Sequence, residues 1–147
     1  MHKRMNLLRA CTLALGLAAV LPASARECFP QMRDGWVRLT PVKMPMMAGF
    51  GRIENHCPNP VTITGVSSPS FGDASLHETR IVDGVSRMRE LSELRIGPDG
   101  AAVLKPGGMH LMLMQPRTEL KEGSRVAVEF ALKDGRVLRG ELEVRKP

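Results

Sequence analysis

Turn-forming residues interrupt this chain at short intervals and leave no long stretch with the periodicity of a helix. Asp83-Gly84, Pro98-Asp99-Gly100, Pro106-Gly107-Gly108 and Asp134-Gly135 each separate short runs in which apolar and polar residues alternate. Such alternation is typical of strands with one buried face, and the intervening residues are those that tight turns require. We therefore predict an all-β protein.

Nine segments have this strand pattern. They are residues 36–40, 49–55, 61–66, 74–82, 85–91, 101–104, 109–114, 125–132 and 136–144. Strands of this number and spacing are typical of an antiparallel β-sandwich with Greek-key connections or of a related barrel. Because no repeat, low-complexity tract or linker divides the chain, the sequence predicts a single domain.

The first 25 residues have the organisation of a secretory signal peptide. A basic start precedes an apolar run over residues 10–21, and Ala23-Ser24-Ala25 supplies the small residues of a cleavage site. The apolar run is too short to span a bilayer. Cys11 stands before this run rather than after it, which argues against a lipid anchor. We expect cleavage after Ala25 and a soluble periplasmic domain over residues 26–147.

The charge of the chain limits its partners. The formal net charge is +6, but Lys3, Arg4 and Arg9 lie in the expected signal peptide, so 18 of the 21 Lys and Arg residues remain against 15 Asp and Glu. The exported domain then carries about +3, with charges of both signs interspersed. It has no basic cluster and no aromatic platform for base stacking, so a nucleic-acid function is set aside.

Cys28 and Cys57 are the only cysteines of the exported domain. Disulfides persist outside the cytoplasm, so we expect these two residues to be paired. The alternative is that a thiolate from one of them binds a metal. Neither cysteine is near His110 in the sequence, which makes that alternative the weaker one.

Two histidines of the exported domain are each tied by spacing to a methionine. His77 is followed after ten residues by Met88, and after a further twenty-one residues by His110-Leu111-Met112. Imidazole and thioether are neutral ligands and a thioether is soft, so this set suits Cu(I) and suits Mg, Ca or Mn poorly. The pattern predicts a site for one Cu(I) ion.

Strand geometry can bring these side chains together. A two-residue turn at Asp83-Gly84 pairs Thr79 with Met88, so His77 lies on the same face as Met88 and diagonally across from it, roughly 7–8 Å away between backbones. In His110-Leu111-Met112 the period of two puts the imidazole and the thioether on one face. A slip of one residue would move Met88 to the other face, so the site depends on register.

Other methionines have open roles. Met44, Met46 and Met47 form a cluster, predicted in a loop, that either passes copper along or is only an apolar lip. Met114 continues the face of Met112 and is either a spare ligand or a packing residue at the rim.

The spacing of His77, Met88, His110 and Met112 resembles the motif of the PCu(A)C-type periplasmic copper chaperones. The similarity covers roughly residues 34–144, including Asp34-Gly35-Trp36 and Lys105-Pro106-Gly107-Gly108. It implies a cupredoxin-like β-sandwich with these four side chains as Cu(I) ligands. It also implies a carrier that supplies the dinuclear copper A centre of cytochrome c oxidase.

The resulting expectation is a monomeric copper chaperone whose partner is subunit II of cytochrome c oxidase or an assembly factor for it. An electron-transfer copper site needs a thiolate, and none lies in the motif. No arrangement of residues suggests a nucleophile, so we expect no enzyme activity. Two alternatives share much of this pattern: a copper storage or detoxification protein, and a secreted β-sandwich that binds another protein without metal.

Overall fold

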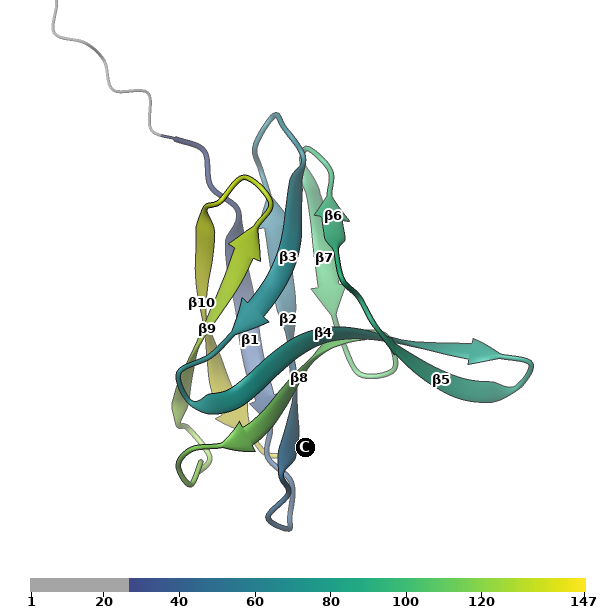
Figure 1. The fold of residues 1–147 in the computed structure, drawn as a ribbon. Coiled ribbons are helices and arrows are strands. Elements are labelled where there is room, and N and C mark those ends of the chain that lie inside the picture. The colour runs from purple at the N-terminus through teal and green to yellow at the C-terminus, as the bar shows by residue number, and fades with distance from the viewer. Residues whose placement is uncertain (1–26) are drawn as a thin grey trace, which may run out of the picture.

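The computed structural model describes residues 27–147, so the expected signal peptide lies outside the described residues. Ten strands make up this part of the chain (Figure 1). Within this range no helix is long and apolar enough to cross a membrane. The strands are β1 (Gln31–Arg38), β2 (Met46–Asn55), β3 (Val61–Ser67), β4 (Phe71–Val82), β5 (Val85–Glu90), β6 (Leu94–Ile96), β7 (Gly100–Leu104), β8 (Met109–Pro116), β9 (Arg125–Leu132) and β10 (Val137–Arg145). The all-β prediction is confirmed.

Two strands differ most from the sequence pattern. β1 begins at Gln31 rather than at residue 36, because a bulge between Arg33 and Trp36 breaks the alternation that the pattern relies on. β6 is not predicted. It has only three residues and exists because Ile96 and its neighbours pair with β3.

The strands form one continuous sheet in the order β5-β4-β8-β7-β2-β1-β10-β9-β3-β6. Pairing is antiparallel except between β1 and β10 and between β7 and β8. The sheet folds over on itself, since β3 contacts β4 and β6 contacts β7 without being paired with them. The β4–β5 hairpin projects away from this folded body, as Figure 1 shows.

The core lies inside the folded sheet, and period-two alternation determines which side chains enter it. Every second residue of β9, from Val126 to Leu132, is buried. In β8, Leu111 and Leu113 are fully buried, whereas Met112 and Met114 are only half-buried. Because alternate residues of a strand point to opposite faces, the buried leucines hold both methionines on the outer face of the sheet.

Cys28 and Cys57 form a disulfide, which confirms the predicted pairing and leaves neither sulfur as a thiolate. The bridge ties the segment before β1 to the loop after β2. Beside it, the side-chain amide of the fully buried Asn55 donates hydrogen bonds to the carbonyl oxygens of Asn59 and Gly97, at 2.9 and 3.0 Å. The Asn55 Oδ1 accepts one from the Cys57 N–H at 3.1 Å. The loop is thus held covalently and by a satisfied buried amide.

Reduction of this bridge is expected to lower the free energy of unfolding by about 3–4 kcal/mol, because the bridge closes a loop with a sequence separation of 29 and so restricts the unfolded chain. Denaturant unfolding with and without reductant measures the difference. The same comparison on a Cys28→Ser/Cys57→Ser variant should show no effect of reductant. Identical midpoints for the oxidised and reduced wild-type protein would contradict a stabilising role.

Candidate metal centre

The β4–β5 hairpin has the register that the sequence predicts. Asp83 and Gly84 form its two-residue turn, and both have a positive φ, 51° and 75°, as a turn of this type requires. Thr79 is the partner of Met88 across the two strands, so His77 lies diagonally across from Met88 on the same face. The predicted approach of these two candidate ligands is confirmed.

β4 also lies beside β8, which brings the second pair of candidate ligands next to the first. His77 is directly opposite His110, and the centroids of their rings are 6.0 Å apart. Ser75 is directly opposite Met112 in the same pairing. Because opposite residues share a face, side chains from β4, β5 and β8 converge on one side of the sheet.

His110 links these elements through both of its ring nitrogens. The side chain is buried, and its Nδ1 lies 3.0 Å from the carbonyl oxygen of Gly108. A carbonyl oxygen only accepts, so Nδ1 carries the proton and Nε2 of the neutral ring has a free lone pair. Nε2 lies 3.2 Å from the sulfur of Met88. Two electron-pair donors thus meet with no proton to share between them, and a soft cation can bind to both.

His77 has one nitrogen engaged and one free. Its Nε2 lies 2.9 Å from the hydroxyl oxygen of Ser75, while its buried Nδ1 has no hydrogen-bond partner among residues 27–147. A ring that donates from Nε2 to Ser75 leaves an unused lone pair at Nδ1, which costs less than an unpaired buried N–H. Nδ1 is therefore available as a metal ligand.

The electrostatic surroundings keep His77 neutral. Burial lowers its pKa because desolvation disfavours the charged imidazolium. The carboxylate of Glu90, directly opposite on β5, raises the pKa, and a positive charge on His110 would lower it further. Desolvation is the largest of these effects, so His77 stays in the protonation state that a metal ligand needs.

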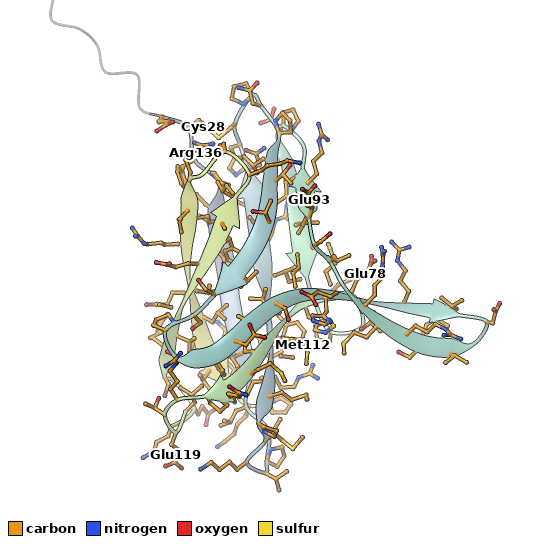
Figure 2. The ribbon with its side chains drawn as sticks, viewed as in Figure 1. Cys28, Glu78, Glu93, Met112, Glu119 and Arg136 are labelled. Atoms are coloured by element: carbon orange, nitrogen blue, oxygen red, sulfur yellow. A yellow bond between two sulfur atoms is a disulfide. The ribbon has the colours of Figure 1, made fainter. Side chains whose placement is uncertain are left out.

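The thioethers form the open side of the site. Met88 is 54% exposed, and Met112 is half-buried below the base of the hairpin (Figure 2). Among residues 27–147, no group of three or more His, Cys, Asp or Glu side chains could hold a metal ion. Metal binding at this place therefore depends on the sulfur atoms as much as on the imidazoles.

Three neighbours of the candidate ligands are missed by the sequence analysis. Ser75 and Gly108 each lie two residues before a histidine and contact its ring. Period-two spacing on a strand is the signal that could have found Ser75. Gly108 lies before β8 and contacts His110 through its backbone carbonyl oxygen, which the alternation of side chains does not indicate. Glu90 could also have been found, because the predicted register that pairs Thr79 with Met88 places Glu90 directly opposite His77.

The predicted loop cluster of Met44, Met46 and Met47 is wrong. Met46 and Met47 belong to β2, and Met47 is buried in the core. Met44 lies before the strand and is exposed. Met46 is directly opposite Met114 of β8, on the outer face of the sheet.

Comparison with known proteins assigns a family. The model of the family described as "Putative lipoprotein LpqE-like" matches residues 31–144. This chain belongs to the LpqE-like family. It is 34% identical over 147 residues to "Putative lipoprotein Lxx21020" of Leifsonia xyli subsp. xyli, and the match covers 92% of this chain and 87% of that relative.

The fold of this LpqE-like protein is similar to that of solved PCuAC domains and is cupredoxin-like, as the sequence predicts. The Cu(I) form of DR1885 from Deinococcus radiodurans matches with a TM-score of 0.65 and 25% identity, over 84% of this chain and 83% of that one. The apo PCuAC domain from PmoF1 has a TM-score of 0.66 and 16% identity, with coverages of 82% and 98%. The copper-bound PCuAC domain from PmoF2 has a TM-score of 0.65 and 15% identity, with coverages of 80% and 93%.

Acid titration of the metal-free LpqE-like protein is expected to show a pKa of His77 below the ordinary value of about 6.5, because burial disfavours the charged ring. Since the folded pKa lies below the unfolded one, the associated stability is present above about pH 6.5 and is lost as the pH falls through the folded pKa. Imidazole proton shifts followed by NMR measure the pKa directly. A midpoint for His77 at or above the ordinary value of about 6.5 would contradict the argument.

Proposed function

We propose that this LpqE-like protein is an exported Cu(I) carrier that holds one ion with His77, Met88, His110 and Met112. The observation that carries the proposal is the 3.2 Å contact between Nε2 of His110 and the sulfur of Met88, with the proton of His110 held at its other nitrogen. The neighbours in fold support copper as the cargo, because DR1885 was solved with Cu(I) and the PmoF2 domain was solved copper-bound.

The ligand set favours Cu(I) over Cu(II). All four ligands are neutral and two are thioethers, which suit the softer, monovalent ion. Electron-transfer copper sites add a cysteine thiolate, but Cys28 and Cys57 are bonded to each other. Figure 2 shows Cys28 at one end of the folded sheet, away from Met112. The protein is therefore proposed to carry copper rather than to cycle it or to catalyse a reaction.

The exposed position of Met88 suits delivery to a partner. A neutral ligand at the surface can be replaced by a ligand of an acceptor while the buried His110 still holds the ion. The opposite face of the hairpin carries Arg80, Arg87 and Arg89, whose charges Glu78 offsets only in part through ion pairs with Arg80 and Arg89. These charges favour encounter with an acidic acceptor. The proposed acceptor is the copper A centre in subunit II of cytochrome c oxidase, or an assembly factor for it.

Alanine substitution of His77, Met88, His110 or Met112 is expected to weaken Cu(I) binding by more than the roughly 10–100-fold that loss of an outer partner costs at a metal site. The fold should persist, because all four side chains lie on the outer face. Anaerobic titration against a competing Cu(I) chelator measures the affinity, and circular dichroism checks the fold. Met44→Ala, which removes an exposed thioether outside this set, is the matched control and should change little.

Incubation of the Cu(I)-loaded protein with an apo copper A domain separates the proposed carrier from its alternatives. Spectroscopic growth of the copper A centre supports delivery. Tight Cu(I) binding without transfer to this domain or to an assembly factor favours storage or detoxification. If the wild-type protein binds Cu(I) no more tightly than the His110→Ala variant does, the proposal is contradicted. The alternative of a secreted β-sandwich that binds another protein without metal would then remain.

Export and cleavage after Ala25 are proposed from the sequence. The lipoprotein wording in the family's and the relative's descriptions raises the question of a lipid anchor. Cys28, the first cysteine of the proposed mature chain, has its sulfur bonded to Cys57 and cannot carry a lipid. We therefore expect the mature protein in the soluble fraction of an osmotic-shock extract, with Arg26 as the first residue by N-terminal sequencing. Recovery in the membrane fraction with a lipid-modified Cys11 would contradict this expectation.

A further inference from the structure

A row of methionine side chains continues the candidate metal centre along the outer face of the sheet. β2 pairs with β8 so that Met46 is directly opposite Met114 and Ala48 is directly opposite Met112. Direct partners in an antiparallel pair have backbones about 5 Å apart, and residues two apart on a strand are separated by about 7 Å. Three thioethers therefore start from neighbouring points of one surface.

The burial pattern shows that these side chains are directed away from the core. Met46 is 38% exposed, whereas the next residue, Met47, is buried at 7%. Met112 and Met114 are half-buried and alternate with leucines that are fully buried. Packing of the core accounts for Met47 but not for the outer three, so the outer three are available to bind a ligand.

The positions around this row suit a soft cation. Ala48, which stands opposite Met112, carries only a methyl group and so adds no bulky side chain beside Met46 and Met112. On the other side of Met114, the exposed Asp73 of β4 is its direct partner. The carboxylate of Asp73 can offset the single positive charge of a nearby ion. Three thioethers form a neutral, soft donor set that selects Cu(I) over Zn or Cu(II).

We infer that Met46, Met112 and Met114 form a second, weaker Cu(I)-binding site, called here the second station. It exchanges the ion with the proposed site of His77, Met88, His110 and Met112. The inference rests on the proposed function for its cargo. Met112 belongs to both sets, so the ion moves by exchanging Met46 and Met114 for His110 and its partners while it stays bound to the sulfur of Met112. The copper remains Cu(I) throughout, and no proton or electron is required. The station lies on the β2–β8 side of the first site, opposite the projecting β5 edge of the sheet.

The test is an anaerobic Cu(I) titration of the protein followed by NMR of methionine methyl groups labelled with carbon-13. The first equivalent is expected to shift the methyl signals of Met88 and Met112. The second equivalent is expected to shift those of Met46 and Met114. It should shift that of Met112 again, because the thioether sulfur of Met112 has two lone pairs and then bridges the two ions. The signal of the buried Met47 should not move. If the first equivalent does not shift the signals of Met88 and Met112, the proposed function is contradicted. If only the second equivalent fails to shift the signals of Met46 and Met114, the second station alone is contradicted.

A Met46→Leu/Met114→Leu variant then isolates the second station. Leucine keeps the apolar volume and removes the sulfur, so the fold and the affinity for the first equivalent should be retained. The affinity for the second equivalent should fall by at least about tenfold, or 1.4 kcal/mol. Met47→Leu, next to Met46 but on the core face, is the control and should retain both steps. The inference is overturned if the double variant binds the second equivalent like wild type, or if Met46 and Met114 stay unshifted through two equivalents.

Discussion

The pairing of β4 with β8 is the constraint on which the candidate metal centre depends. The inner face of this pair places Leu76 opposite Leu111, and both are buried in the core. Burial of a leucine is worth about 1.5–3 kcal/mol, so a slip of one residue that exposed this row would cost several kcal/mol. The same register places His77 opposite His110 on the outer face. The candidate ligands are held in position by the packing of the side chains on the other side of the strands.

Local patterns predict the parts of the site that lie close together in the sequence. The turn residues Asp83 and Gly84 determine the hairpin register, and therefore the approach of His77 to Met88. Alternation within β8 predicts that His110 and Met112 share a face. The disulfide follows from cysteine number and export. These features depend on residues a few positions apart or on chemistry, which is why the sequence alone is sufficient for them.

Pairings between distant strands could not be predicted in the same way. No local pattern in β4 or β8 predicts that the two strands pair. The approach of His110 to His77 is therefore predicted only by the resemblance to a known motif. The parallel pairing of β1 with β10 and the short strand β6 also depend on contacts between distant segments, so local patterns do not predict them. Met46 falls outside the predicted strand over residues 49–55, and its pairing with Met114 follows only from the placement of β2 beside β8.

The protein separates two uses of sulfur. The cysteine sulfurs form a covalent bridge, and the thioethers of Met88 and Met112 lie on the outer face as candidate ligands. Because the metal-binding atoms are neutral, the proposed site gains affinity from softness and from two held imidazoles rather than from charge. Such a site is proposed to bind Cu(I) selectively and to release it to an acceptor with stronger thiolate ligands.

X-ray absorption spectroscopy of the protein loaded anaerobically with half an equivalent of Cu(I) tests the central claim most directly. At this loading only the stronger site is filled, and the account predicts a Cu(I) edge with two nitrogen and two sulfur neighbours. The His110→Ala variant should lose a nitrogen neighbour under the same conditions. A first shell made only of nitrogen and oxygen, or one unchanged by His110→Ala, would contradict the account.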